Sequence, residues 1–132
     1  MSSGGKKVLI FIVAYNAEKT IRSVVTRIPV DRLPAGSEIL VIDDSSSDRT
    51  FEAARAQGEA VPGLKLTVLF NPVNQGYGGN QKIGYQYAIA HGFDVVALLH
   101  GDGQYAPEKL PDLIQPVLDG SGDACFGSRM ME

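Results

Sequence analysis

VLIFIVA, at Val8–Ala14, is an unbroken apolar run near the start of the chain. A half-exposed strand alternates apolar and polar residues, whereas a strand covered on both faces reads as a continuous apolar run. We therefore predict a buried strand of a parallel sheet over these residues. It is the first element of an alternating pattern that continues along the chain.

Further apolar runs and amphipathic stretches alternate after this strand. Strands are predicted at Glu38–Ile42, Leu64–Phe70, Val95–Leu99 and Ala124–Phe126. Helical spacing of apolar residues, with Pro, Gly and Ser at the boundaries, predicts helices at Ala17–Arg27, Asp48–Gln57, Tyr77–His91 and from Pro107 to about Leu118. This alternation implies right-handed crossovers and an α/β fold, with a doubly wound, mainly parallel sheet and helices on both faces.

The composition fits one globular domain. The chain has 132 residues, of which 44% are hydrophobic and 20% are charged, and a domain typically holds on the order of 100 to 150 residues. We expect a flexible N-terminus at residues 1–5 and one partial domain at residues 6–132. No internal repeat or low-complexity linker indicates a boundary within that domain.

Charge and cysteine content exclude several classes of protein. The formal net charge of -3 argues against a nucleic-acid binder, which needs an excess of Lys and Arg. The single cysteine, Cys125, cannot form an internal disulfide, and no signal pattern precedes the first strand, so we predict a cytoplasmic protein. The apolar run Val8–Tyr15 is far shorter than the roughly 18 to 20 residues of a membrane-spanning helix.

Ligands of open α/β sheets bind beyond the carboxyl ends of the strands. Three such segments are rich in polar groups, namely AYN at 14–16, DDSSS at 43–47 and HGDGQ at 100–104, and we expect them to converge. Tyr15 offers an aromatic face on which a base can stack, and Asn16 can both donate and accept hydrogen bonds. The alternative for Tyr15 is an ordinary core residue.

Two adjacent carboxylates, Asp43 and Asp44, follow the second strand. A carboxylate at this position can accept hydrogen bonds from a nucleobase imide or a ribose hydroxyl, and we favour Asp44 for that role. Helix capping by Ser45, Ser46 or Asp48 explains part of the cluster but does not require both aspartates.

Asp102 follows the apolar run Val95–Leu99 and is the leading candidate for a metal ligand. A hard divalent cation takes oxygen ligands, keeps several waters and often uses one or two protein carboxylates together with substrate phosphates. One aspartate can therefore suffice. The alternative is an aspartate in an ordinary Asp102-Gly103 turn.

The glycine-rich segment NQGYGGN, at Asn74–Asn80, precedes the third helix. Exposed backbone amides and the helix dipole there favour a phosphate or a sugar. Gln81 stands where the dinucleotide-binding pattern G-x-G-x-x-G requires glycine, and the segment follows the third strand rather than the first, so it is not a Rossmann fingerprint. A flexible turn is the alternative for the individual glycines.

Five motifs, in order along the chain, resemble glycosyltransferase family 2. They are VAYN at 13–16, VIDDSS at 41–46, NQGYGG at 74–79, DGQYAPE at 102–108 and GSR at 127–129. Together they cover nearly the whole chain, and their collinearity is more specific than any single motif. The nearest branch looks like the dolichol-phosphate or polyprenol-phosphate sugar synthases.

The resemblance implies a GT-A fold and inverting transfer of a hexose from a UDP- or GDP-linked sugar, with Mg²⁺ or Mn²⁺ on Asp102. His100 occupies the first position of the family's usual Asp-x-Asp motif, a departure that affects the metal or the ribose contact, and Val13 stands where proline is usual. Arg129 is implied near the diphosphate or a phosphate acceptor, and its alternative is a surface ion pair. The candidate substrate-binding residues are Ala14, Tyr15, Asn16, Asp43, Asp44, Gly76, Gly78, His100, Gly101, Gln104 and Arg129.

The sequence leaves the acceptor open. An alcohol acceptor needs a general base, whereas a lipid phosphate such as a polyprenyl phosphate is already ionised and mainly needs positioning. A lipid acceptor would make the protein peripheral at the cytoplasmic membrane face. Family members normally continue past residue 129, so we expect the general base beyond residue 132 and expect this chain to bind a donor but transfer sugar poorly on its own. An incomplete sheet also favours a homo-oligomer formed through an exposed edge.

Two other classes of protein are considered. A sugar-1-phosphate nucleotidyltransferase would carry a glycine-rich, basic loop directly after the first strand, and AYNA at 14–17 is not such a loop. A non-catalytic or degenerate nucleotide-sugar-binding module fits His100 and the chain length. Metal-dependent donor binding distinguishes that module from an enzyme only in part, because donor binding is necessary but not sufficient for transfer.

Overall fold

The computed structural model describes residues 7–29, 32–33, 36–59, 65–101, 107–112, 114 and 125–126. Within these ranges the chain forms a five-stranded sheet in the order β3-β2-β1-β4-β5. The strands are β1 Val8–Ala14, β2 Glu38–Asp43, β3 Lys65–Phe70, β4 Val95–His100 and β5 Cys125–Phe126. Every pairing in the sheet is parallel. The predicted α/β fold and the predicted strands are confirmed, with boundaries that differ by about one residue.

Strand β1 lies at the centre of the sheet, paired with β2 on one side and β4 on the other. All of its residues are buried. Val8, Ile10 and Ile12 belong to one hydrophobic cluster, and the alternate residues Leu9 and Phe11 belong to a second. A strand covered on both faces needs apolar side chains at every position, which explains why its sequence shows no alternation.

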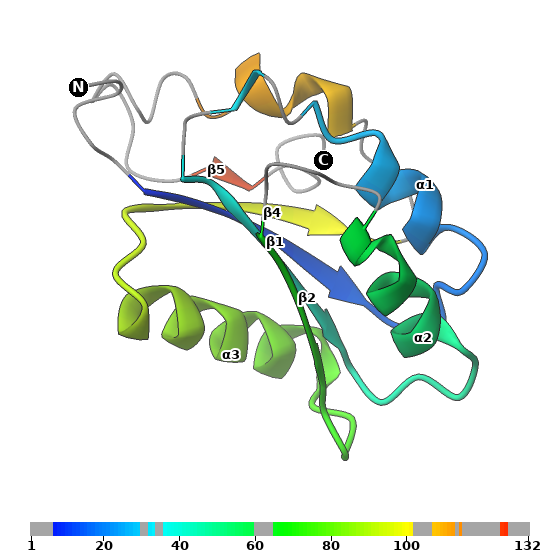
Figure 1. The fold of residues 1–132 in the computed structure, drawn as a ribbon. Helices are drawn as coiled ribbons and strands as arrows, with labels where there is room; N and C mark the ends of the chain where they lie inside the picture. Colours follow the sequence, from blue (N-terminus) through cyan, green and yellow to red (C-terminus); the bar gives the residue numbers. More distant parts are fainter. Residues whose placement is uncertain are drawn as a thin grey trace.

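Helices cover the two faces of the sheet unequally (Figure 1). Helices α1, Ile21–Thr26, and α2, Thr50–Arg55, contribute to the first cluster, and the 3-10 helix η3, Ala56–Glu59, extends α2. Helix α3, Gly76–Ala90, lies alone on the opposite face in the part of the chain that the structure describes, and its Ala88 joins the second cluster. The predicted cover on both faces is confirmed.

The first two helices begin later than predicted. Residues 17–20 form a turn before α1, in which the Ile21 N–H donates to the Ala17 carbonyl at 2.8 Å. Asp48 lies before α2, where its Oδ1 accepts from the Thr50 backbone N–H at 3.0 Å. Polar side chains near the helix starts compete for backbone N–H groups, so helical periodicity in the sequence overestimates the helix length.

The segment that follows Pro107 also differs from the prediction. It starts as a 3-10 helix, η4, at Pro107–Lys109, and residues 110–112 and 114 are helical. The rest of the helix predicted to about Leu118 lies outside the described residues. Leu110 and Ile114 are buried against the α1 and α2 side of the sheet, which places this segment on that face.

Helix α3 approaches the sheet closely at one point. A Cβ atom added at Gly84 would lie 2.1 Å from the Phe11 ring. Only a residue without a side chain allows this contact, so Gly84 sets the distance between α3 and β1. That close packing fixes the position of the whole helix, including its N-terminus near the carboxyl edge of the sheet.

The strand order produces a topological switch point. The chain proceeds from β1 to β2 and β3 toward one edge, and then returns to place β4 on the other side of β1. The connections after β1 and β4 therefore diverge, which opens a crevice at the carboxyl ends of these strands, the usual ligand position in such sheets. Among the described residues, no helix combines the length and the apolar character needed to span a membrane.

Candidate functional site

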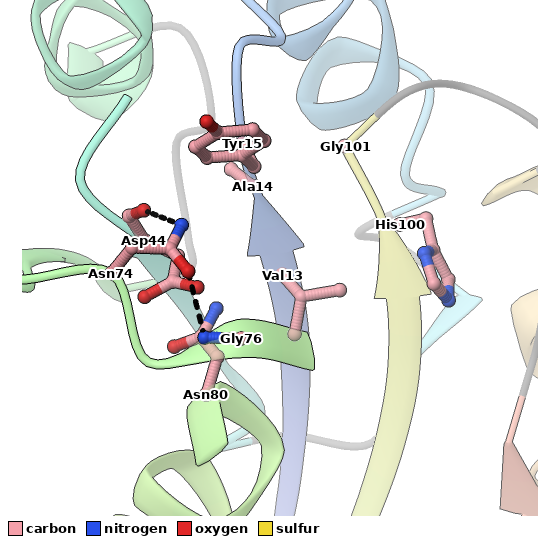
Figure 2. A pocket seen from close by; sticks show the side chains of 9 residues that line it. All are labelled: Val13, Ala14, Tyr15, Asp44, Asn74, Gly76, Asn80, His100 and Gly101. Atoms are coloured by element: carbon pink, nitrogen blue, oxygen red, sulfur yellow. Dashed lines mark hydrogen bonds between the residues drawn. The ribbon is translucent and has the colours of Figure 1, made fainter. Parts of the chain in front are cut away.

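A cavity of about 410 Å³ lies at this switch point. Its walls come from the ends of β1 and β4, from the loop after β2, and from the start of α3. Figure 2 shows Asp44, Asn74 and Asn80 on one side of β1 and His100 on the other. The lining residues are Val13, Ala14, Tyr15, Asp44, Asn74, Gly76, Asn80, His100 and Gly101.

Tyr15 stands directly beyond the end of β1 and exposes 56% of its surface. Its ring lies at the mouth of the cavity, past the last residue of the strand (Figure 2). The alternative of a core residue is therefore wrong, because an aromatic ring this exposed gains little from packing. An exposed ring at a cavity is suited to stacking on a planar ligand.

Asp44 is 4% exposed and is held from three directions. Its backbone N–H donates to the Ala14 carbonyl at 2.9 Å, which joins the loops after β1 and β2. Its Oδ1 accepts from Asn71 Nδ2 at 2.9 Å and from the Gln75 backbone N–H at 2.8 Å. The carboxylate is thus fixed at the cavity wall, next to the start of α3.

The loop before α3 is shaped by two residues. Asn74 donates from Nδ2 to the Asp44 carbonyl at 2.9 Å, and its Oδ1 accepts from the Gly76 N–H at 2.9 Å. Gly76 has φ +75, a left-handed conformation that residues with a side chain adopt at a cost. The first residue of α3 therefore reaches the cavity with its backbone, where the helix dipole favours an anion.

Asp43 faces the other side of the sheet. It is fully buried, and its Oδ1 accepts from both the backbone N–H and the hydroxyl of Ser46. Its Oδ2 is buried without a hydrogen-bond partner among the described residues. Asp43 does not line the cavity, so the structure separates it from Asp44, with which the sequence paired it.

Asn16 also lies outside the cavity lining. Its Oδ1 accepts from the Ser47 N–H at 2.9 Å, and its own N–H donates to Ser46 Oγ at 2.8 Å. Asn16 has φ 48, a conformation that Asn tolerates better than most residues. Its contacts join the loop after β1 to the loop after β2, a structural role that the prediction of substrate binding did not include.

A second pair of contacts fixes the same two loops. The Thr50 hydroxyl accepts from the Ala17 N–H at 2.8 Å and donates to Asp48. Burial raises the pKa of Asp48, but hydrogen bonds from the Thr50 hydroxyl and from backbone N–H groups, including that of Glu18, outweigh it and hold the pKa below its ordinary value. The Asp48 carboxylate is therefore ionised in this network.

His100 ends β4 and lines the cavity on the side opposite Asp44 (Figure 2). The next residue, Gly101, donates from its N–H to the Val13 carbonyl at 2.8 Å and accepts at its carbonyl from the Thr20 hydroxyl at 2.6 Å. The backbone that leads to position 102 is therefore tied to β1 and to the turn before α1.

The segment that begins at Pro107 is held to the end of α1. Arg27, at the end of α1, donates from Nε and Nη2 to the two carboxylate oxygens of Glu108, at 2.6 and 2.8 Å. This paired hydrogen bond raises the pKa of Arg27 and lowers the pKa of Glu108. Both charges are exposed to solvent, so the pair orients the segment more than it stabilises the fold.

Three predicted residues, Asp102, Gln104 and Arg129, lie outside the described residues. Among the residues that the structure does describe, no group of three or more His, Cys, Asp or Glu side chains is placed to hold a metal ion. The prediction of a metal at Asp102 stays a prediction.

The cavity brings together Ala14, Tyr15, Asp44, Gly76, His100 and Gly101 from the predicted set, and it does not include Asn16, Asp43 or Gly78. Three lining residues, Val13, Asn74 and Asn80, belong to motifs quoted from the sequence but were not among the candidate substrate-binding residues. Asn71, which contacts Asp44 behind them, was missed. Asn71 directly follows β3, so applying the strand-end rule to that strand would have found it.

Comparison with known proteins agrees with this geometry. Residues 9–132 match the family described as glycosyl transferase family 2. An undecaprenyl-phosphate mannosyltransferase of Micrococcus luteus is 32% identical over 123 residues, which are 93% of this chain and 48% of that protein. A dolichol-phosphate mannosyltransferase of Pyrococcus furiosus is 30% identical over 126 residues, which are 96% of this chain and 34% of that protein.

A solved structure shows the same arrangement of strands and helices. The crystal structure of glucosyl-3-phosphoglycerate synthase from Mycobacterium tuberculosis, in complex with uridine diphosphate, matches with a TM-score of 0.70 and 26% identity, over 91% of this chain and 43% of that one. The chain thus spans about half, or less, of the length of these proteins. Its parallel sheet, its helices and its match over residues 9–132 show a GT-A fold, and the chain belongs to glycosyltransferase family 2.

Proposed function

We propose that this chain forms the nucleotide-sugar-binding part of an inverting glycosyltransferase, which transfers a hexose from a UDP- or GDP-linked sugar. The observation that carries the proposal is the cavity at the switch point, which combines the exposed Tyr15 ring, the fixed Asp44 carboxylate and the N-terminus of α3. The ring suits stacking of a base, the carboxylate suits the hydrogen-bonding edge of that base, and the helix N-terminus suits the diphosphate of the same ligand. The synthase structure with uridine diphosphate supports this class of ligand.

The base would be recognised by Asp44 and Tyr15. The Oδ1 of Asp44 is occupied by Asn71 and Gln75, and Oδ2 receives no hydrogen bond from the described residues. Oδ2 is therefore the oxygen that would accept an N–H of the base. Stacking on the Tyr15 ring would add about 1 to 3 kcal/mol, by analogy with bases on aromatic side chains in nucleic-acid complexes.

The diphosphate would lie at the start of α3. The helix is 15 residues long, so its dipole is well developed, and the Gly76 backbone reaches the cavity. The Gly76 N–H itself donates to Asn74 Oδ1 at 2.9 Å, so the positive end of the helix dipole, rather than this N–H, would attract the diphosphate. No side chain at Gly76 obstructs the approach of the diphosphate to the helix end.

A divalent cation, Mg²⁺ or Mn²⁺, would be held by Asp102 and by diphosphate oxygens. The described part of the lining provides one carboxylate, Asp44, and one imidazole, His100. Asp44 is already committed to two N–H donors, and imidazole is a poorer ligand for Mg²⁺ than a carboxylate is. When bound, such a cation neutralises the charge that develops on the departing diphosphate. In this proposal, His100 orients the ribose or sugar side of the donor.

The acceptor is proposed to be a polyprenyl phosphate. The relatives from Micrococcus luteus and Pyrococcus furiosus carry undecaprenyl phosphate and dolichol phosphate in their names. A phosphate oxygen is already a nucleophile at neutral pH, so transfer to it requires alignment rather than a general base. A lipid acceptor of this kind would place the reaction at a membrane surface.

A second candidate is a nucleotide-sugar-binding module without transferase activity. The observation that favours it is His100, which stands at the position where the family usually carries the first aspartate of its metal motif. Both candidates require donor binding, whereas only the enzyme releases free nucleoside diphosphate when an acceptor is supplied.

Thermal unfolding with UDP, GDP and their sugar conjugates, with and without Mn²⁺, tests donor binding. A ligand that binds only the folded chain at a hundredfold excess over Kd stabilises it by about 2.7 kcal/mol. We expect a shift for one base, dependent on Mn²⁺ and reduced in Asp102→Ala. The absence of a shift with every nucleotide would rule out the donor site in this chain. A shift without nucleoside diphosphate release on a polyprenyl phosphate would favour the binding module.

A further inference from the structure

We infer that Asn71 and Asn80 are positioning residues for base recognition: their side-chain amides form a relay that leaves one defined oxygen of Asp44 for the ligand. The inference rests on the proposed nucleotide site and extends it to two residues behind the cavity wall. Asn71 follows β3 and Asn80 lies in the second turn of α3, so the relay links the sheet to the helix.

The relay is a continuous chain of hydrogen bonds. Asn80 donates from Nδ2 to the Ile42 carbonyl at 3.3 Å, and its Oδ1 accepts from Asn71 Nδ2 at 3.1 Å. The same Asn71 nitrogen donates to Asp44 Oδ1 at 2.9 Å. The chain therefore begins at a main-chain atom of β2 and ends on the carboxylate that lines the cavity.

The chemistry of its two ends fixes the direction of the relay. A backbone carbonyl can only accept, so the Asn80 amide must direct its NH₂ group to Ile42 and its oxygen to Asn71. Asn71 must then direct its NH₂ group toward Asn80 and Asp44. At the other end, the Gln75 backbone N–H can only donate, at 2.8 Å, to the same oxygen of Asp44.

Asp44 consequently presents one unsatisfied acceptor to the cavity. Two donors already occupy Oδ1, and the structure records no donor to Oδ2 within the described ranges. A base with an N–H at its edge, such as uracil at N3 or guanine at N1, complements that oxygen. A base with a ring-nitrogen acceptor there, such as cytosine at N3, would meet two facing lone pairs.

The location of the two amides supports a functional role. Asn80 is 2% exposed and Asn71 is 8% exposed. On α3, Asn80 shares its sheet-facing stripe with Gly84 and Ala88, which have no polar side-chain atoms. A buried amide in such a stripe costs stability unless it is fully hydrogen-bonded, so packing alone would favour an apolar residue.

The test measures base discrimination. Affinities of UDP, GDP, CDP and ADP, with Mn²⁺ present, would be determined by calorimetry for the unsubstituted chain, for Asn71→Leu and for Asn80→Leu. The matched control is Gln57→Leu, which also removes a buried amide but one that donates at 3.1 Å to Ala53 on α2. We expect the ratio of Kd between CDP and the preferred nucleotide to fall about tenfold in Asn71→Leu and less in Asn80→Leu, with no change in the control.

A second substitution separates positioning from general damage. In an Asp44→Ala background, Asn71→Leu should have no further effect on any Kd, because the relay then has no carboxylate to orient. Equal weakening of all four nucleotides in Asn71→Leu, or an additive effect in the double variant, would overturn the inference. If the leucine variants fail to fold, Asn71→Ser and Asn80→Ser serve in the same comparison.

A measurement without nucleotide distinguishes failure of the relay from failure of the proposed function. Asp44→Ala should shift the side-chain NH₂ resonances of both Asn71 and Asn80 in an NMR spectrum of the free chain. Unchanged Asn80 resonances would overturn the relay whatever the chain binds. Shifted resonances in a chain that binds none of the four nucleotides would retain the relay and reject the nucleotide site.

Discussion

Asp43 and Asp44 are adjacent in sequence but lie in opposite environments at the end of β2. Asp43 turns toward the face covered by α1 and α2, where Ser46 satisfies one of its oxygens in a fully buried position. Asp44 turns toward α3 and lines the cavity. Side chains alternate between the two faces of a strand, so neighbouring residues with the same chemistry can serve a loop on one face and a ligand on the other.

The hydrogen-bond networks around these two aspartates also differ between the two faces of the sheet. On the Asp43 side, Asn16 donates a hydrogen bond to Ser46 and accepts one from Ser47, which joins the loops after β1 and β2. On the Asp44 side, Asn71 and Gln75 both donate to Oδ1 of a carboxylate that lines the cavity. The first network holds the loops together, and the second, in our proposal, prepares an acceptor for a ligand.

Asp44→Ala should have the largest effect on nucleotide binding. A hydrogen bond to a charged group contributes about 1.5 to 3 kcal/mol, so Kd for the preferred nucleotide should rise roughly 10- to 100-fold. Isothermal titration calorimetry on the folded variant measures this change. An affinity within threefold of the unsubstituted chain would show that the two aspartates do not divide the roles in this way.

Asp43→Ala should give the opposite result, with a large effect on stability and little on affinity. The change leaves the partly buried donors of Ser46 without their acceptor, and we expect a loss of about 1 to 3 kcal/mol in the free energy of unfolding. Urea unfolding measures it, with Asp43→Asn as a milder control that keeps an acceptor oxygen. Normal stability combined with a tenfold loss of nucleotide affinity would contradict the assignment of Asp43 to the loop.

The smallest expected effect is a pH dependence that arises on the Asp43 side. Because the folded chain holds the pKa of Asp48 below its ordinary value, ionised Asp48 stabilises the fold above pH about 4. That contribution is lost as the pH falls through the lower folded pKa. Melting temperatures recorded from pH about 6 to 3 should therefore fall less steeply in Asp48→Asn. Identical slopes in the two proteins would show that the Thr50 and Glu18 contacts do not act on this carboxylate.

The sequence predicted the sheet well because its strands are buried. The continuous apolar runs at Val8–Ala14 and Val95–Leu99 are typical of strands covered on both faces, and the two strands pair in parallel within the sheet. Helix starts were predicted less accurately. Near the start of α2, Asp48 accepts from the Thr50 N–H, and Glu18 accepts from the Arg49 N–H. Glu18 is about 30 positions away and also donates its N–H to Asp48, a contact that helical spacing does not reveal.

The candidate site was predicted in part for a similar reason. Residues directly after β1, β2 and β4 were identified because strand ends converge in any parallel sheet, and Tyr15, Asp44 and His100 do line one cavity. The same rule applied to β3 would have identified Asn71, but its contact with Asp44, across 27 positions, could not be predicted from local sequence. Asn80 was placed in the predicted helix Tyr77–His91 and in the glycine-rich segment considered for a phosphate or sugar, but its buried contact with Asn71 was not predicted.

By itself, the sequence determined the succession of strands and helices along the chain and the edge of the sheet at which polar residues gather. Both follow from local properties of the chain, namely hydrophobic periodicity and the polarity of strand ends. Only the tertiary structure decided which of two neighbouring aspartates lines the cavity and which oxygen of Asp44 accepts from Asn71 and Gln75. Those outcomes depend on the face to which β2 directs each side chain and on donors supplied by β3 and α3. Hydrogen bonds between distant segments exist only once packing has brought those segments together.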